Sequence, residues 1–124
     1  MRPDIRIKRI YEPPQTEDGA RVLVDRVWPR GLRKEAATLT RWHRDAAPST
    51  ALRHWFGHDP ARWEAFQARY RAELDANADA LDALRELARA GPLTLLYGAR
   101  DTAHNHAAVL AQYLREHLET EEKP

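Results

Sequence analysis

Two short polar segments of the sequence hold the residue types that could do chemistry. The first reads "LVDRVWPRG" (residues 23–31), an apolar run that contains Asp25 and Arg26 and ends in a turn. Neighbouring side chains of a regular strand point to opposite faces, so each buried charge needs a partner of its own. A structural ion-pair network and a ligand-binding role both satisfy that requirement, and both stay open.

The turn that ends this segment favours an anion ligand. Trp28 precedes Pro29 and is therefore biased to an extended conformation, and Gly31 lets the chain turn tightly. Arg30 would then project from a stiff base, and its planar guanidinium suits a carboxylate or a phosphate. The alternative is that Trp28 is a core residue and Arg30 an ordinary surface residue.

The second segment reads "YGARDTAHN" (residues 97–105) and is expected to lead into a helix. Asp101 or Thr102 can cap that helix, and for Asp101 alone capping is the favoured role. His104 would lie in the first helical turn, where the helix dipole disfavours imidazolium and leaves a neutral imidazole able to accept a proton. Arg100 and the free backbone N–H groups of the helix start would favour a negative ligand.

Together the two segments suggest an enzyme, or a ligand-binding domain, that acts on a small anionic molecule. His104 would transfer a proton, with Asp25 or Asp101 as its orienting or acidic partner. Arginines would bind the anion, and an aromatic side chain would face an apolar or ring portion of the ligand. These proposed contact residues are Arg26, Arg30, Arg100, Trp28 and Tyr97.

No metal ion or organic cofactor is expected. His104 and His106 are two residues apart on a helix and do not share a face, so they do not form a metal pair. The sequence contains no H-E-x-x-H, P-loop, G-x-S-x-G or complete dinucleotide fingerprint. It also contains no cysteine, which excludes thiolate catalysis.

Hydrophobic periodicity places the two segments among strands and helices. The first predicted strand begins at Ile5, and the second and third cover residues 21–27 and 93–97. The predicted helices cover residues 50–56, residues 60–90 with a break near Asn77, and a last segment that carries Ala107, Leu110, Leu114 and Leu118. The expected helix boundaries are an N-cap at Ser49, an end at Gly57 and a second N-cap at Asp59, before Pro60.

This order of elements predicts an α/β fold. We expect a single domain over residues 1–118, with a small, mainly parallel sheet flanked by helices, and a flexible tail over residues 119–124. The second and third strands, joined by a helical crossover, should be parallel neighbours. Ligands of open parallel sheets bind outside the carboxyl ends of the strands. Both polar segments leave strands at that edge and are expected to share one cavity.

Length, charge and composition limit the number of domains, the class of partner and the cellular location that we expect. A chain of 124 residues fits one domain, and a formal net charge of +1 provides no global field for polyanions. The absence of cysteine, of a membrane-spanning run and of a signal-peptide core predicts a cytoplasmic protein. The oligomeric state stays open.

Three stretches of the sequence resemble a known family. "VDRVWPRGL", "APSTALRHWFGHDPARWEAFQARYRAEL" and "LTLLYGARDTAHNHAAVL" are similar to the YeaO-like proteins, a branch of the bacterial domain of unknown function 488. The similarity runs from about Ile5 to Leu114. It implies a small cytoplasmic α/β domain but no established activity.

The family's recurrent positions correspond to residues in all three stretches. They fall on Asp25, Arg26, Trp28, Pro29, Arg30 and Gly31, on Ser49, Arg53, Trp55, His58 and Asp59, and on Tyr97, Arg100, Asp101, His104 and Asn105. The resemblance thereby adds Ser49, Arg53, Trp55 and His58 to the candidate residues, and Arg53 and Asn105 are expected to bind the ligand. More distant members carry cysteines around the second motif, so a thiol-dependent activity does not transfer to this chain.

Two other function classes compete with a small-molecule site. A nucleic-acid or regulatory binding module could use the arginines and stack Trp28 or Trp55 on a base. Near-neutral charge and the lack of a basic run or a recognition helix make nucleic acid the less favoured partner. A protein-interaction domain with a structural polar cluster is the third option, and a large exposed apolar patch away from the two segments would favour it.

Overall fold

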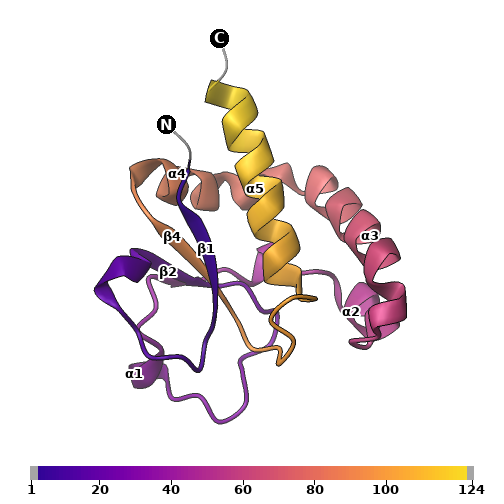
Figure 1. The fold of residues 1–124 in the computed structure, drawn as a ribbon, viewed down its shortest axis with the longest axis horizontal. Coiled ribbons are helices and arrows are strands. Elements are labelled where there is room, and N and C mark those ends of the chain that lie inside the picture. The colour runs from indigo at the N-terminus through magenta and orange to yellow at the C-terminus, as the bar shows by residue number, and fades with distance from the viewer. Residues whose placement is uncertain (1–2, 123–124) are drawn as a thin grey trace.

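Four parallel strands form the sheet of the computed structural model, which describes residues 3–122 (Figure 1). The strands lie in the order β1-β4-β2-β3, so β4 is a central strand with β1 and β2 on either side. Their bounds are β1 (Ile5–Arg9), β2 (Ala20–Leu23), β3 (Arg41–Trp42) and β4 (Leu93–Tyr97). The prediction that the second and third expected strands, β2 and β4, are parallel neighbours is confirmed.

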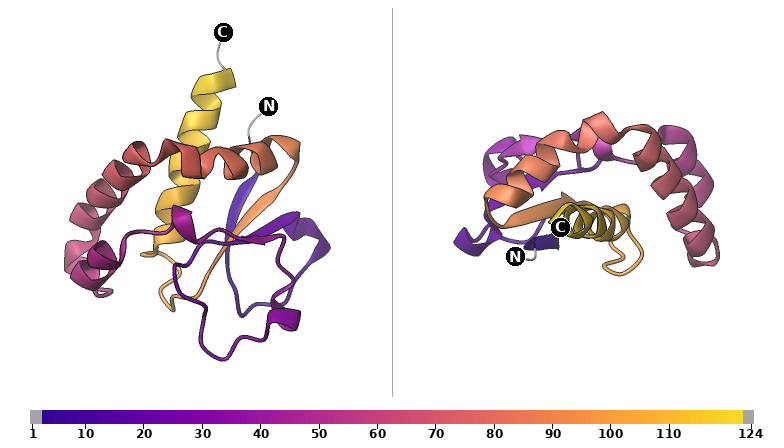
Figure 2. Two further views of the ribbon diagram at one scale, coloured as in Figure 1. Left: turned by 180° about the vertical axis from the view of Figure 1, so that it is seen from behind. Right: turned by 90° about the horizontal axis from the view of Figure 1, so that it is seen from above.

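Five α-helices accompany the sheet in the described part of the chain. They are α1 (Lys34–Ala37), α2 (Thr50–Phe56), α3 (Trp63–Ala76), α4 (Asp82–Ala90) and α5 (His106–Glu122). Short 3-10 helices cover Thr16–Asp18, Arg44–Ala46, Pro60–Arg62 and Ala78–Leu81. Figures 1 and 2 place α5 between the sheet and the pair formed by α2 and α3.

The expected helix boundaries in the middle of the chain are confirmed. The Ser49 hydroxyl accepts a hydrogen bond from the Leu52 backbone N–H, and α2 ends at Gly57 in the left-handed conformation. The Asp59 carboxylate accepts from the Ala61 N–H, and α3 stops before Asn77. These are local interactions, which is why the residue types alone could indicate them.

The last helix, α5, differs from the sequence-based expectation at both of its ends. The last helix begins at His106 rather than near Asp101, and its first turn is capped by Asn105, whose Oδ1 accepts from the Ala108 N–H at 2.9 Å. The prediction that Asp101 or Thr102 caps this helix is therefore wrong. At its other end α5 reaches Glu122, so residues 119–122 of the expected tail are helical, and residues 123–124 lie outside the described residues.

The second strand is shorter than predicted, because β2 ends at Leu23 and not at residue 27. The Val24 N–H still donates to the Leu96 carbonyl of β4, but the two carbonyls that follow accept from side chains. The Val24 carbonyl accepts from His106 Nε2 at 3.0 Å, and the Asp25 carbonyl accepts from Trp42 Nε1 at 2.8 Å. With these acceptors occupied the ladder cannot continue, so Asp25 begins a loop rather than lying within a strand.

The hydrophobic pattern also fails to predict β3 and α1. These elements contain two and four residues respectively. Segments of that length are too short to establish a period of two or of 3.6 residues.

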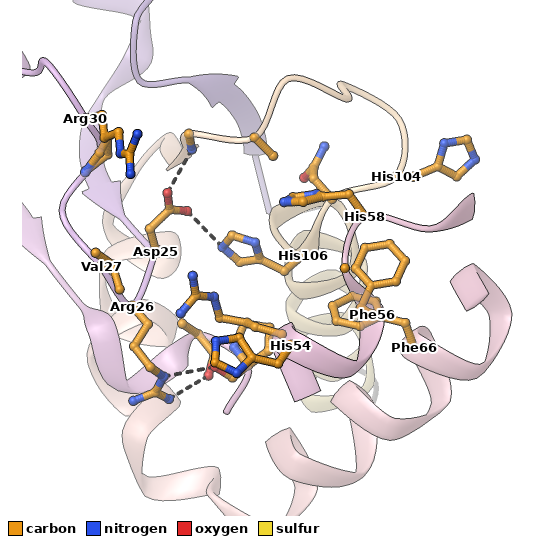
Figure 3. Close-up of a pocket in the computed structure, with 18 of the residues that line it drawn as sticks. Asp25, Arg26, Val27, Arg30, His54, Phe56, His58, Phe66, His104 and His106 are labelled. Atoms are coloured by element: carbon orange, nitrogen blue, oxygen red, sulfur yellow. Dashed lines mark hydrogen bonds and ion pairs between the residues drawn. The ribbon is translucent and has the colours of Figure 1, made fainter. Parts of the chain in front are cut away.

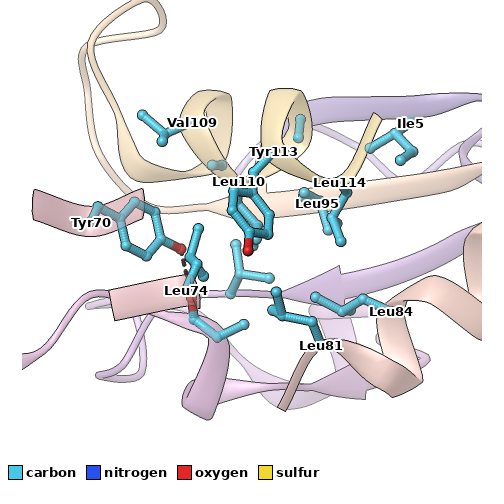
Figure 4. Close-up of a cluster of buried hydrophobic side chains, with 14 of the residues drawn as sticks. Ile5, Tyr70, Leu74, Leu81, Leu84, Leu95, Val109, Leu110, Tyr113 and Leu114 are labelled. Atoms are coloured by element: carbon cyan, nitrogen blue, oxygen red, sulfur yellow. Dashed lines mark hydrogen bonds between the residues drawn. The ribbon is translucent and has the colours of Figure 1, made fainter. Parts of the chain in front are cut away.

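Apolar side chains form two clusters on the two faces of the sheet. Alternate residues of β4 separate between them, because successive side chains of a strand point to opposite faces. Leu95 and Tyr97 belong to the larger cluster, with buried residues of α2 to α5 such as Leu110 (Figure 4), whereas Leu96 joins the smaller cluster with Leu23. The larger cluster fixes α5, and with it the start of that helix, against the sheet.

Within residues 3–122, every helix is too short or too polar to span a lipid bilayer.

A buried ionic network lies near the start of β2, away from both polar segments. Asp18 is 4% exposed and its carboxylate contacts Arg21, Lys8 Nζ at 3.1 Å and the Gln15 N–H at 3.0 Å. Arg21 also donates to two backbone carbonyls at the end of α1. Burial alone would raise the pKa of Asp18, but hydrogen bonds from Gln15, Lys8 and Arg21 outweigh it and lower that pKa.

We expect Asp18→Asn to lower the free energy of unfolding by about 3 kcal/mol, because it leaves buried cationic partners without their counter-charge. The lowered pKa means that this stabilisation is present above the unfolded-state pKa and is lost as pH falls through the folded-state pKa. Urea unfolding from pH 7 to pH 2 should therefore show the two proteins converging in acid. Asp4→Asn, which removes an exposed ion pair with Arg6, is the control and should change stability far less. Equal stability of the Asp18 variant and the parent at pH 7 would contradict this account.

Candidate functional site

A cavity of about 630 Å³ opens beside the carboxyl ends of β2 and β4. Its walls come from the loop after β2, from α2 with the turns that flank it, and from the loop between β4 and α5, with Tyr11 from the loop after β1 and Phe66 from α3. The ionisable side chains that line it, apart from Tyr11, are Asp25, Arg26, Arg30, Arg53, His54, His58, His104 and His106. The two polar segments thus line one cavity, and Arg30 and His104 are both among its wall residues (Figure 3).

The Asp25 carboxylate joins the three elements that meet at this cavity. Its Oδ2 accepts a hydrogen bond from the Gly98 N–H at 3.0 Å, which ties the loop after β2 to the loop after β4. Its Oδ1 lies 3.1 Å from Nε2 of His106, the first residue of α5. Both side chains are 17% exposed, so the pair lies largely inside the protein.

His106 is oriented by a backbone carbonyl as well as by the carboxylate. Its Nε2 lies 3.0 Å from the Val24 carbonyl, an oxygen that can only accept, so Nε2 carries a proton. That N–H is directed at Val24, and the buried Oδ1 of Asp25 has no aligned hydrogen bond within the described chain. The contact between His106 and Asp25 is therefore electrostatic rather than an aligned hydrogen bond.

Arg26 is largely committed to structure. Its Nε donates to the Pro48 carbonyl at 3.0 Å and its Nη2 to the Ala47 carbonyl at 3.1 Å. These bonds attach the segment before α2 to the end of β2 and so position the α2 wall. Arg26 still lines the cavity, but two of its three nitrogens are occupied.

Arg30 and Arg53 have their guanidinium groups available. Both are exposed, both line the cavity, and neither side chain makes a hydrogen bond or an ion pair within the described residues. They come from different walls, Arg30 from the turn after β2 and Arg53 from α2. Guanidinium groups of this kind can form charge-assisted hydrogen bonds to a carboxylate or a phosphate.

His104 pairs with Asp101, one of its two predicted partners. Its Nδ1 lies 3.0 Å from Asp101 Oδ2, and its ring contacts Trp63 edge-on with 5.2 Å between the centroids. Backbone N–H groups of His104 and Ala103 lower the pKa of Asp101, so this carboxyl stays ionised and is unsuited to donating a proton near neutral pH. His104 itself lies at the rim of the cavity with its ring pointing away from Asp25 (Figure 3).

The premise that His104 lies in the first helical turn is wrong, because α5 begins two residues later. The helix dipole was expected to act on His104, but in the structure it acts on His106. The nearest charged group to His104 is instead the Asp101 carboxylate, whose Oδ2 lies 3.0 Å from Nδ1.

Four other site residues predicted from the sequence either do not line the cavity or already use their polar atoms in hydrogen bonds within the protein. Trp28 donates through Nε1 to the Leu32 carbonyl and packs in the smaller core cluster. Tyr97 is buried in the larger cluster, and this burial raises the pKa of its hydroxyl. Arg100 is exposed but is not among the wall residues. Asn105 lines the cavity, although both of its amide atoms are used in bonds to the backbone.

The residues alone do not single out the other three histidines of the wall, and the family resemblance adds only His58 to the candidates. The sequence suggests no role for His106 beyond the excluded metal pair. Its contact with Asp25 joins residues 81 positions apart, and hydrophobic periodicity cannot reveal such a contact. His54 offers no local signal. For His58 the local sequence signal is the preceding glycine. Both residues have positive φ, 52° at Gly57 and 57° at His58, so the chain turns sharply after α2. The described residues contain no cluster of His, Cys, Asp or Glu that could hold a metal ion.

We expect Gly98→Ala to destabilise the protein by about 1–3 kcal/mol, because a Cβ at this position would lie 2.9 Å from Asp25 Oδ2 and displace the carboxylate. Gly91→Ala is the matched control, since a Cβ there meets nothing within 4 Å and its φ of 166° is extended backbone. Thermal unfolding of both variants provides the measurement. Equal melting temperatures would show that the contact between Asp25 and Gly98 does not hold the two loops together.

Comparison with known proteins places the chain in a family. Residues 4–124 match the family described as "Inactive DUF488-N3 subclade". The chain is 43% identical over 112 residues to "Uncharacterized protein YeaO" of Escherichia coli (strain K12), covering 90% of this chain and 97% of that protein. It is 46% identical over 110 residues to "Uncharacterized protein Rv3073c" of Mycobacterium tuberculosis (strain H37Rv), covering 89% of this chain and 92% of the relative. No solved structure matches it significantly. The resemblance seen in the sequence is thereby confirmed: this chain is a YeaO-like member of the DUF488 family.

Proposed function

We propose that the cavity binds a small molecule bearing a phosphate or carboxylate group, and that the protein is a ligand-binding domain without turnover. The balance of charge around the cavity supports the first part. Three guanidinium groups and four imidazoles line it, against the single carboxylate of Asp25. Arg30 and Arg53 make no side-chain bonds within the described chain, so an anion would complete their hydrogen bonding.

The contacts of the two histidines fit a binding role, and His104, the predicted proton-transfer residue, has its ring pointing away from Asp25. His106 Nε2 is held by the Val24 carbonyl, and the ionised Asp101 holds His104 Nδ1. Each imidazole therefore has one nitrogen fixed by the protein, as suits a hydrogen-bond donor of defined orientation. The matching family is described as inactive, which agrees with a site that retains a ligand but does not transform it.

Arg30→Ala and Arg53→Ala are each expected to weaken the binding of inorganic phosphate about tenfold or more, because each removes a charge-assisted hydrogen bond. Neither change should alter the melting temperature appreciably, since both side chains are exposed. Chemical-shift titration of labelled protein at low ionic strength measures the affinity, and acetate provides the carboxylate counterpart.

Arg33→Ala is the matched control, because Arg33 is exposed and does not line the cavity. It should bind both probes as the parent does. Shift changes scattered over the surface, or equal affinities in all three variants, would contradict an anion site between Arg30 and Arg53.

A further inference from the structure

Only two large apolar side chains are exposed in the described part of the chain, and both line this cavity. Tyr11 is 45% exposed and Val27 is 59% exposed. Val27 can face outward because β2 has already ended at Leu23, so strand alternation no longer directs it into the core. Exposed apolar surface next to a cavity marks a place where a ligand or partner is bound.

Tyr11 is held in place although it is exposed. Its hydroxyl donates to the Arg30 carbonyl at 2.8 Å, and the guanidinium of Arg9 lies 5.0 Å from its ring centroid. Arg9 is itself anchored, because its Nε donates to the Ala99 carbonyl at 2.9 Å in the loop after β4. A ring fixed at its edge and on one face loses little conformational freedom when a ligand packs against it.

The anchored ring lies next to the cations of the cavity. The residue whose carbonyl binds the Tyr11 hydroxyl is Arg30, whose guanidinium is uncommitted and lines the same cavity. Val27 comes from the same loop, three residues earlier. The apolar pair and the anion-binding group are thus parts of one wall. Trp28 and Tyr97, the aromatic residues expected from the sequence to face a ring, do not line the cavity.

From this arrangement we infer that the ligand is an anion carried on a planar apolar group, of the aryl phosphate or aryl carboxylate type. The anionic group binds Arg30 and Arg53, and the planar group packs on Tyr11 and Val27. This inference rests on the proposed function, since it specifies what the bound anion is attached to. The apolar area is too small for a stable protein interface, which needs about 800 Å² on each partner.

The test compares phenyl phosphate with methyl phosphate, two monoesters that carry the same anionic group. Chemical-shift titration of the parent protein should give a dissociation constant about tenfold lower for phenyl phosphate, with shift changes at Tyr11 and Val27 for that ligand only. Val27→Ser and Tyr11→Ala should each reduce this ratio toward one. Ala72→Ser, at an exposed position of α3 away from the cavity, is the matched control and should keep the parent's ratio.

The possible outcomes separate the two proposals. Equal affinities for the two esters, with Arg30→Ala weakening both, would overturn the aryl inference and leave the anion site standing. A phenyl preference that survives in both Val27→Ser and Tyr11→Ala would also overturn it, because the ring would then bind elsewhere. Failure of both esters to bind would overturn both proposals.

Discussion

The candidate site depends on the carboxylate of Asp25. One of its oxygens accepts from the Gly98 N–H at 3.0 Å and the other lies 3.1 Å from His106 Nε2, so a single side chain connects two loops and the start of α5. A largely buried carboxylate is costly unless it is paired, and this cost is what forces the three elements together. Gly98 is part of the same requirement, because a side chain there would occupy the space of the carboxylate.

The position of Asp25 explains why the cavity is basic although an acid stands within it. The carboxylate is turned toward Gly98 and His106, where its charge is partly compensated. The guanidinium groups of Arg30 and Arg53 remain on the open walls. Under the proposed function, an anion would approach these two arginines, and its interaction inside a partly enclosed cavity would be less screened than on an open surface.

The parts of this structure that could be predicted from sequence are those set by local chemistry or by long apolar runs. The fully buried β4, the Ser49 cap and the break at Asn77 belong to this group. The end of β2 could not be predicted, because it is decided by side chains from distant segments that bind its carbonyls. The role of His106 was hidden for the same reason: its partner lies 81 positions earlier in the chain.

Arg26 and Arg30 show how the folded structure decides between structural and binding roles that sequence leaves open. They lie four residues apart in one segment and line the same cavity. Arg26 is bound to the carbonyls of Ala47 and Pro48 before α2, and a ligand would have to compete with those bonds. Arg30 has no such obligation, because its own carbonyl, not its guanidinium, is what fixes Tyr11. Under the proposed function, an anion that binds Arg30 would gain a hydrogen-bond partner without breaking one, and this difference favours the turn over the strand end as the anion site.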